Sequence, residues 1–426
     1  MRVLRSVLPV FVFALCLLCL GAAVYGRAAF ASPQEPTVSE IPTPAETAET
    51  PAPTPEPTPE PTPEPTPEPE ARLVPLTVSY RNAPVPVLTD GDYNTVKNFM
   101  PNEPMIIEAE SPISALYIQW EYTPTPWTLS CGETVLQQGA HGYHHEYIPL
   151  PEAATRLEMM LPKGDEPWLA EIYGFTDGVR PDWVQDWEEP WEQADLLVFP
   201  THSDDEFIFL GGLIPYYIDQ GKQVQVAYVV RHKGNRYHEM LDSLWAAGET
   251  HYPITSNKAD VYQNTLGGAR EYYGENYMTS YMTEQIRRFR PQVVVGQAED
   301  GDSGHIVHVF GVMCLKKAVE QAGDAAFFPD SAETWGVWDV PKCYLHLYGP
   351  AEDLVSLDYD APLSSFDGTS AFDVADHAFS LCISQYQAGK YQVYRTDSPH
   401  DSSKFGLYRS TVGGDTEKND LFENIE

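Results

Sequence analysis

The sequence has little positive charge, few cysteines and only one long apolar run. Among its 426 residues, 26 Lys and Arg stand against 62 Asp and Glu, for a formal net charge of −36. A surface this negative repels phosphate backbones, and no basic patch is segregated from the acids, so we exclude a nucleic-acid-binding protein. Only residues 6–25 are long and apolar enough to cross a bilayer, which excludes a multi-span membrane protein.

Cysteine is too sparse to suggest a framework of disulfides or a cysteine-rich metal site. Two of the six cysteines, Cys16 and Cys19, lie in the apolar run. The others are Cys131, Cys314, Cys343 and Cys382. Their spacing shows no ligand pair and no disulfide pattern, so we expect mostly buried thiols.

Apolar residues, in contrast, are plentiful enough for a large core. Hydrophobic residues make up 42% of the chain and aromatic residues 12%, which excludes a chain that is disordered throughout. At the usual ~100–200 residues per domain, the length predicts two to four units.

Residues 1–31 have the layout of an export segment. Arg2 and Arg5 precede the apolar run at residues 6–25, and Ala29–Ala31 is a small-x-small site for cleavage. The run is longer than the usual ~7–15 residues of a signal core, so a single uncleaved membrane anchor is an open alternative. In either case we expect the rest of the chain to lie outside the cell.

Residues 32–72 are predicted to be a disordered stalk rich in Pro, Thr and Glu. Residues 32–71 contain 14 Pro and nine Glu but no Lys or Arg, and four Pro-Thr-Pro-Glu units occupy residues 53–68. Proline prevents helix and sheet, and polyproline II at ~3.1 Å per residue gives a spacer of roughly 120 Å. Such a stalk suits a secreted or membrane-anchored protein at the surface of a Gram-positive bacterium. A tail with no spacing role is the alternative.

Residues 73–180 carry a series of short runs typical of β-strands. The runs use Ile, Tyr, Trp and Thr and are separated by Pro, Gly and Asn turns. They are LTVSY, MIIEA, ALYIQW, WTLSC, YIPL, RLEMML and AEIYGF. No segment here has a helical period, so we predict an all-β sandwich domain. The spacing of LTDGDYNT, SALYIQW and AEIYGFTDG resembles the discoidin or galactose-binding-like sandwich.

The function of this first domain stays open at the level of sequence. In the galactose-binding-like family the turn at residues 89–92 sometimes supports a calcium ion, and a plain Asp-Gly turn is the simpler interpretation. We expect three histidines to lie in a surface loop, because they sit in a Gly- and Tyr-rich stretch: His141, His144 and His145. Three tryptophans suit stacking on sugar rings but are more typical of a core: Trp120, Trp127 and Trp168.

From residue 192 to residue 426 the pattern changes to alternating strands and helices. Short continuous apolar runs, typical of buried parallel strands, occupy residues 194–200, 223–230 and 291–296. Helical patterns occupy residues 207–220, 236–248, 280–289 and 309–323. This alternation predicts an α/β domain with a Rossmann-like parallel sheet and helices on both faces.

Two polar clusters directly follow strands of this predicted sheet. Thr201–Glu206 follows the first strand, and Asp300–His308 comes soon after PQVVVG. Ligands of such sheets gather beyond the carboxyl ends of the strands, so we expect the two loops to meet. Together they offer two imidazoles and a carboxylate, a ligand set that holds catalytic zinc and leaves one position to water. Zinc lowers the pKa of that water to ~7, and a neighbouring aspartate can take its proton.

Each cluster by itself has a simpler interpretation. Asp-Asp-Glu before a helix is also a capping sequence, because acids are favourable at a helix N-terminus. A His-x-x-His pair also arises by chance in a chain with 12 histidines. The placement of both clusters after buried strands favours a functional site.

The same clusters resemble a known enzyme family. PTHSDDEFIFLGG, residues 200–212, resembles the AHPDDE signature of the PIG-L/LmbE-like zinc N-deacetylases, and GHIVH resembles their later HPDH motif. The Gly-Gly pair after the acidic motif, the Arg236-x-x-Glu239 pair and the AFSLCISQ segment are supporting similarities. The resemblance extends over most of residues 192–410.

The resemblance implies a role for each matching residue. The Zn²⁺ ligands would be His202, Asp205 and His308. Asp204 would be the general base, and His305 would stabilise the oxyanion or protonate the leaving amine. Arg236 would face the substrate and suit a polar sugar or phosphate group.

Three positions depart from the family pattern. Ser203 replaces the proline of the acidic motif, which loosens the turn but leaves the ligands intact. Val307 stands where the family has Asp, so any carboxylate that tunes His305 is absent or comes from residues 300–302. Cys382 stands in place of a histidine in the later helix, and nothing in the sequence explains that change.

These observations predict an exported, zinc-dependent hydrolase that removes N-acetyl groups from N-acetylglucosamine-type sugars or glycoconjugates. The β-sandwich would hold a glycan. Two alternatives remain open: a non-catalytic glycan-binding surface protein with a degenerate hydrolase domain, and a metal amidase acting on another amide. The ligand set also accepts iron, cobalt or manganese. No feature of the sequence points to an oligomeric state.

Overall fold

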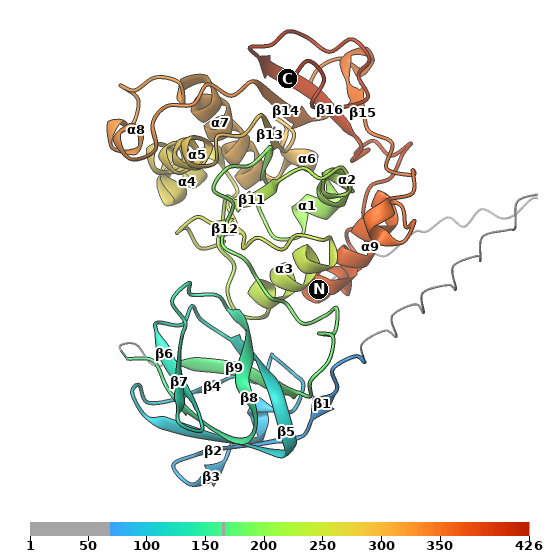
Figure 1. Cartoon of the computed structure of the whole chain (residues 1–426). Coiled ribbons are helices and arrows are strands. Elements are labelled where there is room, and N and C mark those ends of the chain that lie inside the picture. The colour runs from blue at the N-terminus through green and yellow to red at the C-terminus, as the bar shows by residue number, and fades with distance from the viewer. Residues whose placement is uncertain (1–68, 164–166, 426) are drawn as a thin grey trace, which may run out of the picture. The chain divides into compact units, whose positions relative to one another are not determined.

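The computed structural model describes residues 69–163 and 167–425 (Figure 1). The predicted export segment, residues 1–31, lies outside the described residues, and so do residues 32–68 of the predicted stalk. A search of the described part of the chain finds no helix with the length and apolar character that a bilayer crossing requires.

The first part of the described chain is all-β, as its short apolar runs predict. Its strands are β1 (Leu73–Val74), β2 (Leu76–Tyr80), β3 (Ala83–Pro84), β4 (Lys97–Asn98), β5 (Pro104–Trp120), β6 (Trp127–Cys131), β7 (Thr134–Gln138), β8 (His145–Met160) and β9 (Trp168–Phe175). A short 3₁₀ turn, Pro86–Leu88, is the one helical element among the described residues of this part. The strands pair in the order β1-β9-β5-β8-β6-β7, with β2, β3 and β4 attached at the sides.

Two of these strands are longer than the sequence indicates. Residues 105–109 and 115–120, predicted as separate runs, belong to one strand, β5, whose register against β8 shifts between Glu108 and Ala115. The first half of β5 pairs with β2 and the second half with β9. Side chains from both halves, including Ile107 and Ile118, share one core, so the single hydrogen-bonded sheet folds over on itself to make the sandwich.

The second part contains a seven-stranded sheet and most of the helices. Its strands are β10 (Leu196–Phe199), β11 (Val224–Tyr228), β12 (Ile254–Thr255), β13 (Val293–Gly296), β14 (Lys342–His346), β15 (Val355–Ser356) and β16 (Lys404–Ser410). Its helices are α1 (Asp205–Ile208), α2 (Leu213–Asp219), α3 (Asn235–Ala246), α4 (Leu266–Ala269), α5 (Glu275–Phe289), α6 (Gly301–Gly304), α7 (Ile306–Gln321), α8 (Pro329–Trp335), α9 (Ala371–Leu381) and α10 (Ile383–Tyr386). Short 3₁₀ or π turns lie at Arg270–Gly274, Ala351–Asp353 and Ser364–Phe366.

The sheet order is β12-β11-β10-β13-β14-β16-β15. Strands β12, β11, β10, β13 and β14 are parallel, as the alternating pattern predicts. At one edge β16 runs antiparallel to β14, and β15 runs antiparallel to β16. The chain therefore winds outward from β10 in both directions. The gap between the loops after β10 and β13 is the place where ligands gather in such sheets.

Helices cover both faces of this sheet, as Figure 1 shows. Along β10, Leu196 and Val198 pack into a core with α1, α2, α3 and α9, whereas Leu197 and Phe199 pack into a second core with α5 and α7. All four side chains are buried. A strand that is buried on both faces explains why β10 reads as a continuous apolar run instead of an alternating one.

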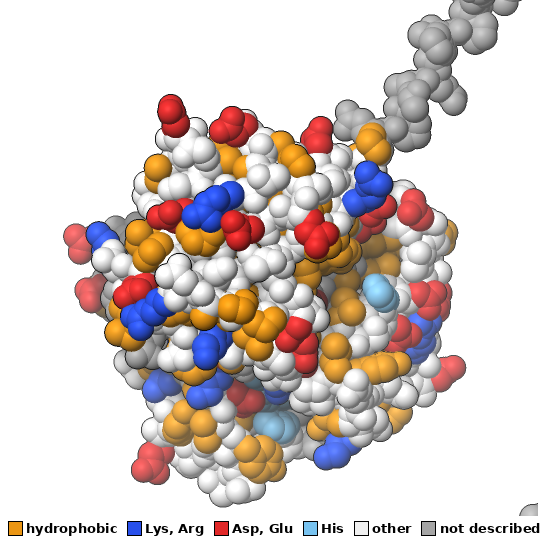
Figure 2. Space-filling view, turned by 90° about the horizontal axis from the view of Figure 1, so that it is seen from below, with side chains coloured by type: hydrophobic (Ala, Val, Ile, Leu, Met, Phe, Trp, Pro, Cys, Tyr) orange, Lys and Arg blue, Asp and Glu red, His pale blue; other side chains and the backbone are white. Residues whose placement is uncertain are grey.

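The surface shown in Figure 2 mixes both signs of charge. On that face, Lys and Arg side chains lie scattered among Asp and Glu side chains, and apolar side chains lie between them. On this face the acidic side chains are therefore not concentrated in one block.

The predicted helix at residues 207–220 is interrupted. It is divided into α1 and α2 by a turn at Gly211, whose φ of +55° is one that only glycine adopts without cost. At Gly212 the backbone touches α9, since a Cβ there would lie 2.5 Å from the Cβ of Ala371. The Gly-Gly pair after the acidic motif thus serves a turn and a close helix contact.

The expectation that His144 and His145 lie in a surface loop is wrong. Their exposed fractions are 6% and 0%, because they lie where the sandwich meets the α/β part. His145 Nε2 lies 2.7 Å from His238 Nδ1, and the ring of His144 stacks on Tyr237 at 3.9 Å between centroids. In sequence, a polar loop at a buried contact looks the same as one in solvent.

Other expectations about buried side chains are confirmed, except for Trp168, which is half-buried and does not belong to the sandwich core. Trp120 and Trp127 belong to the sandwich core, and both indole nitrogens donate to the Glu146 carboxylate at 2.8 and 3.0 Å. The four cysteines in the described residues are free and buried: Cys131, Cys314, Cys343 and Cys382.

The contact at Gly212 leads to a stability prediction. Because a Cβ would meet Ala371, we expect Gly212→Ala to push α9 away and lower the free energy of unfolding by about 1–3 kcal/mol. Gly267→Ala in α4 is the matched control, because a Cβ there meets nothing within 4 Å and alanine favours helix. Urea unfolding of both variants measures the difference. Equal stability of the two would contradict the close-contact argument.

Candidate metal centre

The two polar clusters meet at one edge of the sheet. β10 and β13 are neighbouring parallel strands, with Phe199 paired to Gly296, so the loops that follow them leave the sheet side by side. The first loop carries residues 201–204 and leads into α1, and the second leads through α6 into α7. The predicted convergence of segments about a hundred residues apart is therefore present.

Three of the predicted ligands lie in mutual contact. His202 Nδ1 lies 3.0 Å from Asp205 Oδ2 and 3.0 Å from His308 Nε2. His308 Nε2 lies 3.1 Å from the same Asp205 oxygen. All three side chains are buried. The backbone N–H of His202 also donates to Asp205 Oδ2 at 2.7 Å, which orients the carboxylate toward the imidazoles.

These donor atoms fit a small divalent cation. Two ligands of a tetrahedral zinc ion, each ~2.0–2.1 Å from the metal, lie about 3.3 Å from each other. The separations of 3.0–3.1 Å found here are close to that value. His305 is a further candidate donor, because its ring nitrogen lies within 4.8 Å of those of His202 and His308. We favour Asp205 as the third ligand, because its oxygen contacts both imidazoles directly.

Asp204 occupies a strained position beside these ligands. Its φ of +148° lies in the left-handed half of the map, where residues other than glycine seldom occur. Its N–H donates to Glu206 Oε2 at 2.9 Å, and its carbonyl accepts from the N–H groups of Phe207 and Ile208 at 3.0 and 2.9 Å. Such strain is typical of residues whose placement serves a function.

The surroundings of Asp204 suit a proton acceptor. Burial, and then the charge of the neighbouring Asp205 carboxylate, raise the pKa of Asp204 to about 7. By contrast, the charges of His308 and His202 outweigh burial and hold the pKa of Asp205 well below its ordinary range. Adjacent carboxyls with separated pKa values are typical of a site in which one acid stays ionised while the other exchanges protons.

Glu206 positions the acidic motif, a role that the sequence analysis did not assign. Its side chain is fully buried, and one carboxylate oxygen accepts from the Asp204 N–H while the other accepts from Tyr228 Oη at 2.6 Å. Burial raises the pKa of Glu206 to about 8. The Asp-Asp-Glu run marked Glu206 in the sequence. Its partner Tyr228 comes from β11, so the sequence around the motif could not indicate it.

Arg236 lies at the site, as predicted, and contacts the acidic motif. Its Nη2 donates to Ser203 O at 2.9 Å and to Asp204 Oδ2 at 3.2 Å. Its Nε is buried and has no partner among the described residues. The guanidinium therefore holds Asp204 in place and retains one free N–H.

His305 lies next to the ligands but not against a carboxylate of residues 300–302. Its ring centroid lies 4.9 Å from that of His202 and 4.6 Å from that of His308. Burial, and then the positive charges of those two histidines, lower the pKa of His305 to about 4. Val307, at the family's Asp position, is packed in the apolar core against β10 and cannot tune His305.

Asp302 orients a different histidine. One of its oxygens lies 2.5 Å from His346 Nδ1, and the other lies 3.7 Å from His308 Nδ1, beyond hydrogen-bond distance. The nearer neighbour of His308 Nδ1 is the side-chain amide of Gln297, at 3.0 Å. His346 in turn contacts the Asp401 carbonyl through Nε2 at 3.1 Å. When Nε2 of His308 binds a metal, Nδ1 carries the hydrogen, and the Gln297 amide and the Asp302 carboxylate are the groups that lie behind it.

Two further polar residues, Asp260 and His232, lie at the site and were not predicted from the sequence. Asp260 Oδ1 lies 3.5 Å from His202 Nε2, and its other oxygen lies 3.6 Å from His232 Nδ1. His232 Nε2 accepts from the Ser203 N–H at 3.0 Å. Both residues come from loops near the ends of β11 and β12, where no motif distinguishes them from ordinary loop residues.

The remaining supporting motifs pair with each other. The Glu239 carboxylate accepts from the N–H and hydroxyl of Ser384 at 3.0 and 2.6 Å, which ties α3 to α10. Cys382, at the family's histidine position, is buried, and burial raises the pKa of its thiol. It is therefore a packed neutral thiol.

The placement of Asp302 leads to a prediction about metal binding. We expect Asp302→Asn to lower metal affinity about 10- to 100-fold, because the amide is a weaker acceptor behind His308. Asp300→Asn is the matched control, since the Asp300 carboxylate only accepts from the Asp302 N–H at 3.1 Å at the start of α6. Competition with a chelator of known affinity measures both. Equal affinities would remove Asp302 from the metal centre.

The turn at residues 89–92 of the sandwich has features of a cation site. The Asp90 carboxylate accepts from the Asp92 N–H at 3.0 Å and from the Thr95 hydroxyl at 2.9 Å, as in an ordinary Asp-Gly turn. Next to it, the fully buried carboxylate of Glu171 has no hydrogen-bond partner on either oxygen among the described residues. Burial, and then the neighbouring Asp90, raise the pKa of Glu171 to about 8. Both Asp90 oxygens accept hydrogen bonds within the turn, so the Glu171 oxygens are the ones left for a calcium ion, which binds carboxylate oxygens.

This arrangement predicts a pH-dependent stability. Because the pKa of Glu171 rises from its ordinary value of 4.5 to about 8, the folded protein binds this proton more tightly than the unfolded chain. With bound cations removed by a chelator, the contribution of Glu171 to the free energy of unfolding therefore falls as the pH rises from 4.5 to about 8. We expect Glu171→Gln to raise stability at pH 8 relative to pH 5 by on the order of 1 kcal/mol, or a few degrees in Tm.

Glu158→Gln, at an exposed position on β8, is the control and should show no such pH difference. Millimolar calcium should raise the Tm of the wild-type protein at pH 8 and leave that of Glu171→Gln unchanged. No response of the wild type to calcium would leave the plain turn as the correct interpretation.

Comparison with known proteins finds sequence relatives that are deacetylases. No family model matches the chain. The chain is 26% identical over 220 residues to the 1D-myo-inositol 2-acetamido-2-deoxy-alpha-D-glucopyranoside deacetylase of Geodermatophilus obscurus, a match that covers 44% of this chain and 72% of that protein. It is 39% identical over 137 residues to a second deacetylase of that name from Saccharopolyspora erythraea, covering 32% of this chain and 47% of that protein.

Among solved structures, the N,N'-diacetylchitobiose deacetylase of Pyrococcus horikoshii is 15% identical, covering 47% of this chain and 74% of that chain with a TM-score of 0.32. A pectin-binding carbohydrate-binding module is also 15% identical, covering 26% of this chain and 96% of that chain with a TM-score of 0.20. The sequence relatives of this chain are thus deacetylases that act on an acetamido sugar.

Proposed function

We propose that this protein is a zinc-dependent hydrolase that removes the acetyl group from N-acetylglucosamine-type sugars or glycoconjugates. The observation that carries the proposal is the contact of His202, Asp205 and His308 through one donor atom each, at 3.0–3.1 Å, with Asp204 beside them. The sequence relatives, which are deacetylases of an acetamido sugar, support the choice of substrate class.

The residues around the donor atoms suit hydrolysis of an acetamide. A bound zinc ion would supply Lewis acidity toward the acetamide carbonyl and toward water. Asp204, with its pKa raised to about 7, takes the proton as the water oxygen bonds to the carbonyl carbon. The carbon–nitrogen bond then breaks, the proton passes to the leaving amine, and acetate and the free amino sugar are released.

Two other side chains hold the reacting groups. Arg236 fixes the Asp204 carboxylate through Nη2 at 3.2 Å and holds the Ser203 carbonyl at 2.9 Å. His305, whose ring centroid lies 4.9 Å from that of His202, can as a neutral imidazole donate a hydrogen bond to the developing oxyanion.

The decisive variant is Asp204→Asn in the full chain. Asparagine keeps the shape of the side chain but cannot accept the proton, so we expect acetate release from di-N-acetylchitobiose to fall about 10²–10⁴-fold. The metal content, measured by mass spectrometry, should stay at one ion per chain. Treatment with a chelator should abolish release, and added Zn²⁺ should restore it.

Asp300→Asn is the matched control at the same edge of the sheet, and its rate should stay within about twofold of the wild type. The proposal would be ruled out if the protein held no metal after purification and bound none when metal was added. Full metal occupancy without acetate release would favour a glycan-binding protein with a degenerate hydrolase domain, and release from other amides alone would favour a different amidase.

We also propose that the chain acts outside the cell, secreted or anchored by residues 1–31. The support is the basic, apolar and small-residue order of that segment and the proline-rich residues that follow it. Fractionation of the producing cells, with the protein traced by antibody, tests this. Recovery in the cytoplasmic fraction alone would contradict it.

A further inference from the structure

A cavity of about 390 Å³ lies where the sandwich meets the loop after β11. Glu121, Tyr122 and His144 line it from the sandwich, and Arg231, His232 and Lys233 line it from the α/β part. The two parts are in firm contact here, because the His144 N–H donates to Tyr252 Oη at 3.0 Å and His145 contacts His238 at 2.7 Å. Buried polar contacts of this kind hold both walls of the cavity in place.

The inner wall of this cavity adjoins the candidate metal centre. His232 accepts from the N–H of Ser203 in the acidic motif, and its ring centroid lies 6.0 Å from that of His202. A single imidazole thus separates the cavity from a proposed metal ligand. A group bound in the cavity would therefore lie close to a substrate at the centre.

The rim of the cavity is basic in an otherwise acidic protein. Arg231 and Lys233 are exposed, and neither forms an ion pair among residues 69–163 and 167–425, although acids outnumber bases 62 to 26 in the chain. The charge of Arg231 is felt at His144 across the cavity, where it adds to burial in lowering the pKa of that histidine to about 3. The one carboxylate in the lining, Glu121, lies 3.8 Å from His238 Nε2. Two unpaired cations at a cavity favour an anionic ligand.

The other lining groups suit a sugar ring. Tyr122 is 48% exposed and its ring packs edge-on against Trp168 at 5.9 Å between centroids, which holds it in place. A fixed, exposed aromatic ring can cover the apolar face of a pyranose, while nearby polar groups bond to its hydroxyls. Thr255 and Asn257 supply such groups.

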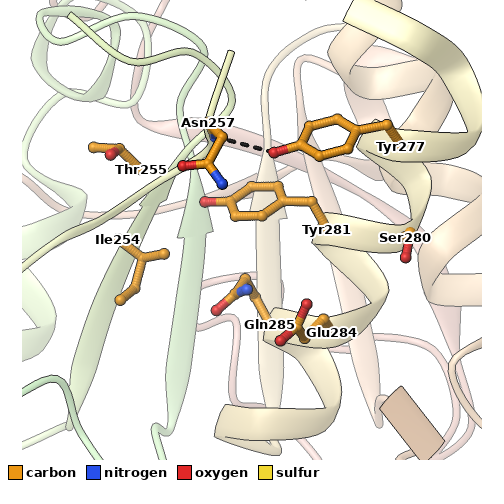
Figure 3. A pocket seen from close by; sticks show the side chains of 8 residues that line it. All are labelled: Ile254, Thr255, Asn257, Tyr277, Ser280, Tyr281, Glu284 and Gln285. Atoms are coloured by element: carbon orange, nitrogen blue, oxygen red, sulfur yellow. Dashed lines mark hydrogen bonds between the residues drawn. The ribbon is translucent and has the colours of Figure 1, made fainter. Parts of the chain in front are cut away.

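A second cavity, of about 300 Å³, continues from the first. The two share Thr255 and Asn257, and the second is lined further on by Tyr277 and Tyr281 of α5, as Figure 3 shows. The Asn257 N–H donates to Tyr277 Oη at 3.0 Å, the dashed line in Figure 3. The concave surface thus extends beyond one sugar unit.

We propose that the cavity between the sandwich and the β11 loop is a substrate subsite for an anionic sugar, one that carries a carboxylate or a phosphate and is joined to the N-acetylated sugar at the metal centre. This inference rests on the proposed function. Arg231 and Lys233 bind the anion, Tyr122 covers the sugar ring, and the sandwich becomes one wall of the binding site. The preferred substrate is then an acidic oligosaccharide.

Calorimetry on the full-length Asp204→Asn variant tests the proposal without turnover. The probes are di-N-acetylchitobiose, which is neutral, the disaccharide of N-acetylglucosamine and glucuronic acid, and N-acetylglucosamine 1-phosphate. We expect at least one anionic probe to bind about tenfold more tightly than the neutral one at low salt, and the preference to shrink as salt is added. The two anionic probes distinguish a carboxylate ligand from a phosphate ligand.

Three variants in that background locate the effect. Arg231→Gln with Lys233→Gln should reduce the anionic preference at least fivefold, and Tyr122→Ala should weaken both disaccharides about fivefold. Lys222→Gln is the control, because Lys222 precedes β11 whereas the two cations follow it, so the preference should not change. No anionic preference, or one that survives loss of both cations, would overturn the proposal.

The two proposals fail separately. Acetate release by the wild-type enzyme with no anionic preference would reject the subsite and keep the deacetylase. An anionic preference that depends on Arg231 and Lys233 in a protein that releases no acetate would reject the deacetylase and keep the binding site.

Discussion

The rest of the site depends on the contact of the Asp205 carboxylate with the imidazoles of His202 and His308. One oxygen of this carboxylate receives the His202 N–H and lies 3.0–3.1 Å from the imidazoles of His202 and His308. A buried carboxylate is costly unless it is paired, so the contact with His308 stabilises the meeting of the two loops. The parallel pairing of β10 with β13 brings them together, and helices on both faces of the sheet hold that pairing.

The acidic motif is arranged around this carboxylate by its neighbours. Asp204 can keep a strained φ of +148° because Glu206 and Arg236 hold its N–H and its carboxylate from two sides. Glu206 depends in turn on Tyr228 of β11. The three adjacent acids therefore have different roles. Asp205 orients the imidazoles, Asp204 has a pKa of about 7, and Glu206 supports the turn.

Much of the fold and of the candidate site could be predicted, because both depend on patterns among residues that are close in the sequence. Continuous apolar runs indicated the parallel strands, and the order of polar residues after β10 indicated His202 and Asp205. The close contact of Gly212 with α9 could not be predicted, because α9 is distant in the sequence. The neighbours of His308 Nδ1, Gln297 and Asp302, likewise depend on how the loop after β13 folds. His144 and His145 were placed wrongly, because their burial is produced by the other part of the chain.

By itself the sequence determined the all-β and α/β character of the two parts, the strand ends that carry the polar clusters, and the kinds of ligand available, because periodicity and residue chemistry are local properties. Only the tertiary structure decided which acid faces which imidazole, that Asp260 and His232 join the site, and that the sandwich forms one wall of a basic cavity beside it. Those features come from packing between distant segments, and a contact between distant segments leaves no mark in the residues that lie next to each other along the chain.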